Sequence, residues 1–253
     1  MKIHIGIPAR FGSTRFPGKP LKEINGLSML EHCYRRAKMV PNIKSVFIAA
    51  GDNLIADFCK NKNLNFILTD PKIQRPGIRV QEAAETLQPD DDDIIVVWQG
   101  DEPLIYPEMV SKAIRPLIDR PEEIFVSNMM AYASNEDREN PSEIKVVVDK
   151  NSNALYMSRA AIPSKYHEEL PTDSFKQVCI MPFRWHFMKR FNYELKPSKL
   201  EQQESIEMLR AIENNYKVAM VLSKYKTKSV DTQEDLNDAI IMMKDDKVML
   251  NYC

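Results

Sequence analysis

The sequence predicts an α/β fold with a mostly parallel sheet and a small mixed or antiparallel subdomain. In the first half of the chain, apolar strand-like runs alternate with amphipathic helix-like segments, as successive strand–helix–strand units require. Residues 94–98 form a continuous apolar run rich in β-branched side chains, which is typical of a central parallel strand buried on both faces. Residues 3–9 form a second such run. A loop rich in glycine and cations follows it, at the place where open α/β sheets bind ligands.

The segments of the first half follow in regular order. Ser28 and Glu31 are spaced as a capping box, so a helix is expected to begin there, with Met29, Cys33 and Ala37 on its apolar face. The expected strands of this half are residues 3–9, 45–50, 65–68 and 94–98. The expected helices after the first are residues 53–62, 80–87 and 106–118.

The pattern changes after about residue 123, where strands joined by short turns replace the alternation. Expected strands are residues 125–132, 144–149, 154–158, 178–183 and 218–221, and expected helices are residues 185–191, 203–214 and 233–243. We therefore expect an α/β domain of residues 1–124 and 201–253, and a mixed subdomain of residues 125–200 that could lie over a site or form a dimer contact.

Composition excludes several classes of function. The chain has 253 residues, 43% of them hydrophobic, and a net charge of −1, so no global field draws it to nucleic acid or to a membrane. No apolar run approaches the length of a membrane span, and the first residues show no signal-peptide pattern. The four cysteines are scattered without a C-x-x-C pair, which favours reduced thiols in a cytoplasmic protein.

The loop after the first expected strand is a candidate polyphosphate site. It carries Arg10, Arg15 and Lys19, together with two glycines, a serine and a threonine. Backbone N–H groups and positive charge of this kind can wrap around phosphates. The loop has neither the dinucleotide fingerprint nor the P-loop spacing, and a generic surface turn is the alternative.

Carboxylates at two distant places are candidate metal ligands. Asp101 follows the buried run 94–98 in the string Gln-Gly-Asp-Glu-Pro, and a hard carboxylate there suits Mg²⁺, which binds through one or two carboxylates plus substrate phosphates. A helix N-cap at Asp101 or Glu102 is the alternative. Asp231 precedes a segment in which Thr232 and Asp235 are spaced to cap a helix.

Two further motifs bear on an acidic ligand. Arg159 would suit a carboxylate, since arginine binds carboxylates in a bidentate manner, although an exposed ion pair is the alternative. Glu201 and Glu204 could hold hydroxyl groups, or they could be an acidic first helical turn favoured by the helix dipole.

Several strings of the chain resemble the CMP-Kdo synthetases (3-deoxy-manno-octulosonate cytidylyltransferases), which activate an acidic eight-carbon sugar with CTP. Residues 8–21 resemble the opening motif of this family, and Gln99–Leu104 match another of its motifs without a gap. Strings at residues 140–163, 197–210 and 229–236 are also similar. The resemblance implies a Rossmann-like nucleotide-binding sheet of the sugar nucleotidyltransferase type, Mg²⁺ as cofactor, a homodimer and a role in lipopolysaccharide or capsule synthesis.

The resemblance also implies roles for individual residues. The implied nucleotide contacts are Pro8, Ala9, Arg10, Ser13, Arg15, Lys19, Arg79, Gly100 and Asp101, of which Arg15, Lys19 and Asp101 would be catalytic. The implied metal ligands are Asp101 and Asp231. The implied acceptor contacts are Gln99, Arg159, Gln177, Glu201 and Glu204.

The chain departs from the family at two places. Gly77 and Ile78 stand where the family has Thr and Asp near the nucleotide, and Gln177 and Met181 stand where it has a His and an aromatic residue near the sugar. The acceptor could therefore be Kdo, a modified Kdo, or another acidic sugar or phosphorylated acid. A nucleotide-binding regulatory protein without transferase activity is the alternative from another class, and the intact Asp101 and Asp231 argue against it.

Overall fold

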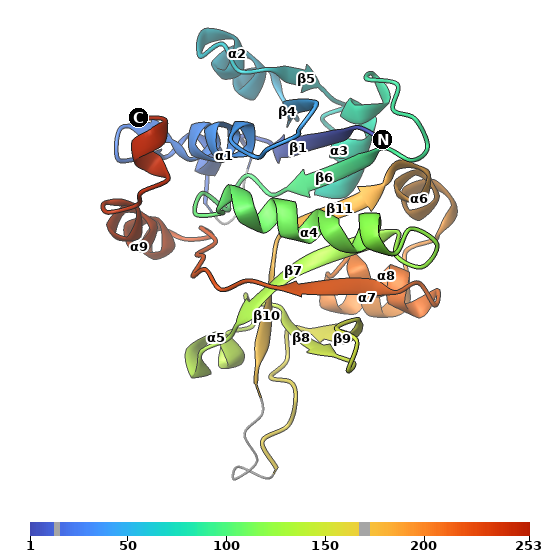
Figure 1. Ribbon diagram of the computed structural model, residues 1–253. Helices are drawn as coiled ribbons and strands as arrows, with labels where there is room; N and C mark the ends of the chain where they lie inside the picture. Colours follow the sequence, from blue (N-terminus) through green and yellow to red (C-terminus); the bar gives the residue numbers. More distant parts are fainter. Residues whose placement is uncertain (13–15, 167–172) are drawn as a thin grey trace. The chain divides into compact units, whose positions relative to one another are not determined.

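The computed structural model describes residues 1–12, 16–166 and 173–253 (Figure 1). The chain forms two compact units. Unit 1 consists of Met1–Ser111 and Lys226–Cys253, and unit 2 consists of Lys112–Tyr225. Among the described residues, no helix combines the length and the apolar character needed to cross a bilayer.

Unit 1 is built on four parallel strands, as the alternation of strand and helix patterns predicted. Their order is β5 (Phe66–Leu68), β4 (Ser45–Ala50), β1 (Ile3–Ala9) and β6 (Ile94–Trp98). All five residues of β6 are buried, which agrees with a central strand covered on both faces. The predicted α/β class is confirmed, and the carboxyl ends of β1 and β6 meet at one edge of this parallel set.

The connecting helices of unit 1 are α1 (Met29–Lys38), α2 (Asn53–Asn61) and α3 (Pro76–Glu85). The predicted capping box of α1 is present, since Ser28 Oγ accepts from Glu31 N at 3.1 Å and Glu31 Oε2 accepts from Ser28 N at 3.0 Å. Helix α3 begins at Pro76, four residues before the predicted start at residue 80, because proline suits the first helical turn.

Two structures that the sequence pattern did not indicate follow β1. The first is a 3₁₀ turn, η1 (Lys19–Leu21), and the second is a hairpin of β2 (Glu23–Ile24) and β3 (Leu27–Ser28). The last helix of unit 1, α9 (Gln233–Met243), has the predicted bounds and a capping box of Thr232 and Asp235. A short 3₁₀ turn, η3 (Met249–Asn251), follows it.

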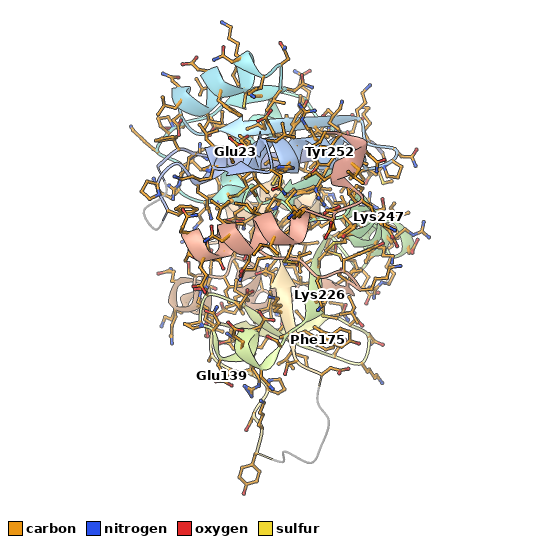
Figure 2. All side chains as sticks on the ribbon, turned by 90° about the vertical axis from the view of Figure 1, so that its left-hand side faces the viewer. Glu23, Glu139, Phe175, Lys226, Lys247 and Tyr252 are labelled. Atoms are coloured by element: carbon orange, nitrogen blue, oxygen red, sulfur yellow. The ribbon has the colours of Figure 1, made fainter. Side chains whose placement is uncertain are left out.

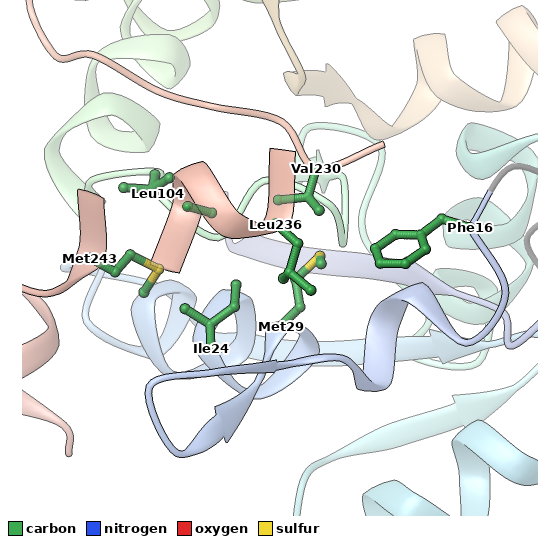
Figure 3. Packing of buried hydrophobic residues seen from close by; sticks show 8 residues of the cluster. Phe16, Ile24, Met29, Leu104, Val230, Leu236 and Met243 are labelled. Carbon is green, nitrogen blue, oxygen red and sulfur yellow. The ribbon is translucent and has the colours of Figure 1, made fainter. Parts of the chain in front are cut away.

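An apolar cluster joins these segments of unit 1. Its side chains come from the loop after β1, the hairpin, α1, the loop after β6, the segment before α9 and α9 itself, and they point toward one another in Figure 3. The buried members are Phe16, Ile24, Met29, Leu104, Val230, Leu236, Ala239 and Met243. Burial of each of these side chains except that of Ala239 contributes about 1.5–3 kcal/mol, so the cluster holds the loops after β1 and β6 against α9.

Unit 2 contains a mixed set of strands around β7 (Val126–Tyr132). On one side β12 (Val218–Leu222) runs parallel to β7, and on the other β10 (Phe175–Val178) and β11 (Ile180–Arg184) pair with it antiparallel. Next to β10 lie β8 (Lys145–Val148) and β9 (Ala154–Ser158). The single strand predicted at residues 178–183 is wrong, because the pairing is interrupted at Cys179.

Helix α4 (Pro107–Asp119) begins in unit 1 and ends in unit 2. The other helices of unit 2 are α5 (Asn135–Glu139), α6 (Trp185–Lys189), α7 (Lys199–Glu204) and α8 (Met208–Glu213). A π-helical turn, η2 (Arg190–Glu194), follows α6. The single helix predicted at residues 203–214 is wrong, because Ser205 has a φ of 55° and ends α7. Residues 112–124 and 201–225, which the sequence grouped with the first domain, belong to unit 2. Pairing of β12 with β7 accounts for part of that difference.

Candidate active site

An ammonium group between two carboxylates lies beside the carboxyl ends of β1 and β6 in unit 1. Lys19 Nζ is 2.7 Å from Asp101 Oδ2 and 2.9 Å from Asp231 Oδ1. The three side chains are 13%, 22% and 23% exposed, so the group is partly covered yet open to a ligand. The sequence singled out all three residues separately, and the structure brings them together.

The local backbone explains how Lys19 reaches this place. Gly18 has a φ of 69°, a left-handed conformation that favours glycine, and its N–H donates to Phe11 O at 3.2 Å. The turn at Gly18 starts η1, which places Lys19 at the first helical position. The predicted contacts Ser13 and Arg15 lie outside the described residues.

A backbone hydrogen bond joins the two segments that carry the carboxylates. Val230 N donates to Asp101 O at 3.0 Å, so Asp231 follows directly after a residue that is tied to Asp101. Gly100 packs closely on β1, since a Cβ atom there would lie 3.0 Å from Pro8 O. A larger residue at position 100 would therefore crowd the end of β1, and glycine avoids this contact.

Electrostatics keep the Lys19 amine charged. Burial lowers the pKa of Lys19. The charges of Asp101 and Asp231 and their hydrogen bonds raise it by more, so the net pKa lies above its ordinary value. The free protein thus holds one protonated amine against two carboxylate groups.

The same geometry fits a divalent metal ion with few protein ligands. Asp101 and Asp231 already converge on one cation, and carboxylate oxygens are the ligands that Mg²⁺ prefers. Among the residues that the structure describes, no group of three or more His, Cys, Asp and Glu side chains could hold a metal. A metal here would therefore complete its coordination with phosphate and water oxygens.

Two arginines flank Gly51 near the start of the loop after β1. A Cβ atom at Gly51 would lie 2.6 Å from Arg79 Nη1 and 3.1 Å from Arg10 Cβ, and Gly51 N donates to Ala9 O at 2.8 Å. Arg10 is exposed, and its Nη1 donates to Gln74 Oε1 at 2.5 Å. Gln74 was not predicted from the sequence, because nothing in its own segment marks it as a partner of Arg10.

Arg79 holds the loop before α3 through hydrogen bonds. It is 3% exposed, Nη1 donates to Thr69 Oγ1 at 2.6 Å, and Nη2 donates to Ile73 O. Burial, followed by the nearby charge of Arg10, lowers the pKa of Arg79. Arg79 thus holds residues 69–73, and the nucleotide contact that the resemblance implies for it stays a prediction.

Of the five implied acceptor residues, Gln99 lies in unit 1 and is half-buried at the turn after β6. In unit 2, Arg159 and Glu204 bind each other: Arg159 N donates to Glu204 Oε2 at 2.9 Å, and Arg159 Nε donates to Glu204 O at 2.8 Å. Ser158 Oγ also donates to Glu204 Oε1 at 2.7 Å. Burial raises the pKa of Glu204, but these hydrogen bonds outweigh it, and the net pKa lies below its ordinary value.

Glu201 has a structural role. It is 1% exposed, and Arg210 binds both of its carboxylate oxygens at 2.5 and 2.7 Å. Both oxygens are engaged in a buried bidentate ion pair, so the acceptor contact implied for Glu201 is replaced by this pair. Gln177 is half-buried, and its Nε2 donates to Met181 Sδ at 3.9 Å, so the two residues of the second departure from the family contact each other.

Known proteins are similar to this chain over most of its length. A family model described as cytidylyltransferase matches residues 5–226. The 8-amino-3,8-dideoxy-manno-octulosonate cytidylyltransferase of Shewanella woodyi is 34% identical over 93% of this chain and 96% of its own. The 3-deoxy-manno-octulosonate cytidylyltransferase of Francisella philomiragia is 38% identical over 93% of this chain and 96% of its own.

Solved structures are similar over nearly the whole chain. A CMP:2-keto-3-deoxy-manno-octonic acid synthetase complexed with CTP superposes with a TM-score of 0.88 and 31% identity, covering 96% of this chain and 98% of its own. A putative glucose-1-phosphate thymidylyltransferase from Bacillus anthracis has a TM-score of 0.67 at 14% identity, covering 97% of this chain and 96% of its own, which shows a shared fold alone.

Proposed function

This chain belongs to the cytidylyltransferase family, and from that premise we propose that it transfers CMP from CTP to an acidic sugar of the 3-deoxy-manno-octulosonate (Kdo) type. The observation that carries the proposal is the convergence of Lys19, Asp101 and Asp231 beside the ends of β1 and β6. A binding protein needs a cation for the phosphates, but it has less need of two carboxylates aimed at one point.

In the proposed reaction a hydroxyl oxygen of the sugar attacks the α-phosphorus of CTP. The new bond joins that oxygen to the α-phosphorus, the bond from the α-phosphorus to the bridging oxygen breaks, and pyrophosphate leaves with the bond's electrons. The hydroxyl proton passes to solvent. Positioning and charge stabilisation account for most of the rate in such transfers.

Different residues of unit 1 would bind different parts of the triphosphate and its metal ion. Lys19 and Arg10 would hold phosphate oxygens, and the backbone at Pro8, Ala9 and Gly100 would line the end of the strands. Asp101 and Asp231 would hold Mg²⁺, which supplies charge neutralisation at the phosphates. With the ion bound, these carboxylates would help to orient the triphosphate relative to Lys19.

The acceptor half of the proposal rests on unit 2. Within the described residues, the hydrogen bonds of Arg159 involve N, Nε and Nη1, the last donating to Pro141 O and Ser142 O. These bonds orient the guanidinium, and its Nη2 edge would meet the carboxylate of an acidic acceptor. Ser158 and Tyr156 hold the Glu204 carboxylate, so Glu204 would support Arg159 and does not need to bind the sugar itself.

Two forms of the sugar are consistent with the comparisons. Relatives named for Kdo and for its 8-amino-8-deoxy analogue match this chain at 38% and 34% identity, respectively. We propose that the contact between Gln177 and Met181 affects the choice between them, because both positions differ from the family string in the same place. A homodimer, which rests on the family resemblance, and a cytoplasmic location, which rests on the scattered cysteines, also belong to this proposal.

The test is pyrophosphate release with each of four nucleoside triphosphates, against Kdo and 8-amino-3,8-dideoxy-manno-octulosonate, with and without Mg²⁺. We expect release with CTP and at least one of the two acids, and only when Mg²⁺ is present. If CTP binds but no pair releases pyrophosphate, the regulatory alternative replaces this proposal. If only one acid reacts, the variant Gln177→His tests whether this position sets the preference.

A further inference from the structure

A buried polar cluster in unit 1 is joined to the stretches of chain that follow Lys19, Asp101 and Asp231. We define the Arg36 cluster as His32 and Arg36 of α1 with Asp246 and Tyr252, which follow α9. Figure 2 labels Tyr252 in this last segment of the sequence. Asp246 and Tyr252 lie beyond residues 5–226, the part of the chain that the family model matches.

Arg36 is the centre of the cluster. Its side chain is 0% exposed, and Nη2 lies 2.5 Å from Asp246 Oδ2. Nε donates to Tyr252 Oη at 3.0 Å, and Nη1 donates to Ile105 O at 3.3 Å. A guanidinium with a fixed planar fork can hold three partners in one arrangement, which a lysine cannot do.

His32 extends the cluster in a defined direction. Its Nε2 faces Ile24 O at 2.7 Å, and because a carbonyl oxygen only accepts, Nε2 carries the proton. Nδ1 then accepts from Tyr252 Oη at 2.8 Å. Burial lowers the pKa of His32, which agrees with a neutral ring. The Tyr252 hydroxyl therefore accepts from Arg36 and donates to His32.

Each of these hydrogen bonds and ion pairs reaches a stretch of chain that follows one of the three residues of the candidate active site. Ile24 lies in the hairpin directly after η1, which begins at Lys19, and Ile105 lies in the loop after β6 that carries Asp101. Asp246 follows α9, and Asp231 lies just before the start of that helix. The three site residues come from segments far apart in the chain, so a common support must set their spacing.

We propose that Arg36 and Tyr252 are positioning residues for the candidate active site, and this inference rests on the proposed function. Neither residue contacts Lys19, Asp101 or Asp231 within the described hydrogen bonds and ion pairs. They act through the backbone, by fixing the hairpin, the loop after β6 and α9 to the same face of α1. The apolar cluster of Figure 3 packs between these same segments, so a change at Tyr252 is transmitted to them.

The test compares Tyr252→Phe with a matched control, Tyr34→Phe. Tyr34 belongs to the same helix α1, is 7% exposed, and its hydroxyl accepts from Asn65 N at 3.2 Å. Each variant therefore loses one hydroxyl beside α1. Only the hydroxyl of Tyr252 belongs to the cluster that holds the three site segments.

Two readouts separate positioning from general stability. The first is hydrogen exchange of the Val230 amide, which donates to Asp101 O and reports the pairing of the two carboxylate segments without any substrate. The second is the division of the kinetic effect between kcat and the KM for the sugar. We expect Tyr252→Phe to speed exchange at Val230 by about tenfold, as for a local opening, and to lower kcat several-fold with little change in KM.

Tyr34→Phe should leave both readouts close to those of the wild-type protein, even if its melting temperature falls as far. Equal exchange at Val230 and equal kcat in the two variants would overturn the positioning role. If the wild-type protein releases no pyrophosphate, the proposed function fails, and the exchange measurement still decides whether the Arg36 cluster holds the two segments together.

Discussion

Asp101→Asn is expected to lower kcat by about 10²-fold or more, on the scale of losing one preorganised electrostatic group. The amide keeps the shape of the side chain but removes the charge that would hold the metal against the phosphates. Folding should survive, because Lys19 still has its 2.9 Å contact with Asp231. Steady-state pyrophosphate release and a melting curve on the same preparation measure the two effects.

The matched control for this variant is Asp90→Asn. Asp90 pairs with Lys2 at 2.9 Å on the surface, and its side chain is 72% exposed, so the variant makes the same charge change away from the site. Surface pairs contribute little to stability, and turnover should be unchanged. Near-normal turnover in Asp101→Asn, or an equal loss in Asp90→Asn, would remove Asp101 from the proposed mechanism. Asp231→Asn should resemble Asp101→Asn.

Lys19→Met is expected to change the affinities for two ligands in opposite directions. Loss of a charge-assisted contact should weaken CTP binding by about 10- to 100-fold, from a typical contribution of about 1.5–3 kcal/mol. In the free protein, however, the Lys19 ammonium occupies the position between Asp101 and Asp231. Its removal takes one positive charge from between the two carboxylates, so Mn²⁺ should bind the nucleotide-free variant more tightly than it binds the wild-type protein.

The control for Lys19→Met is Lys22→Met, three residues further along the chain. Lys22 Nζ lies over the ring of Phe16, 5.3 Å from its centroid, and no described ion pair joins it to either carboxylate. The two variants change the net charge equally, so a general electrostatic effect would appear in both. Equal Mn²⁺ affinity of Lys19→Met and wild-type protein would show that Lys19 does not compete with a metal. Calorimetric titration without and with CTP measures both affinities.

Much of the fold could be predicted because local patterns agree with tertiary packing. The strand at 94–98 and the capping box at Ser28 and Glu31 were predicted with their observed places, since apolar runs and capping residues act within a few positions. The helix predicted at 203–214 was wrong because periodicity does not reveal the left-handed backbone at Ser205, which breaks a continuous apolar stripe into two short helices.

In the candidate site, too, single residues could be predicted from the sequence but their contacts could not. Strings near Lys19, Asp101 and Asp231 marked these residues one by one, but Lys19 and Asp231 are 212 residues apart, and their contact depends on the tertiary fold. The sequence could not decide the role of Glu201. An acidic residue in the first helical turn has the same local pattern whether its side chain meets a ligand or a buried arginine. Arg210 decides between the two, and its partnership with Glu201 exists only after folding.

Tyr252 gave no signal in the sequence for a similar reason. Its partners His32 and Arg36 lie more than 200 residues away, at separations of 220 and 216. No local pattern around residue 252 indicates a hydrogen-bonding role, and the family strings end before it. Only the three-dimensional structure shows that this segment returns to α1.

The central claim is that Asp101 and Asp231 hold one divalent metal ion on the triphosphate while Lys19 turns to the phosphates. The most direct measurement is a crystal structure with CTP and Mn²⁺, in which anomalous scattering locates the ion. We predict one Mn²⁺ at about 2.1 Å from an oxygen of each carboxylate, with Lys19 Nζ moved onto a phosphate oxygen. An ion bound by phosphates alone, with Lys19 still between Asp101 and Asp231, would contradict the account.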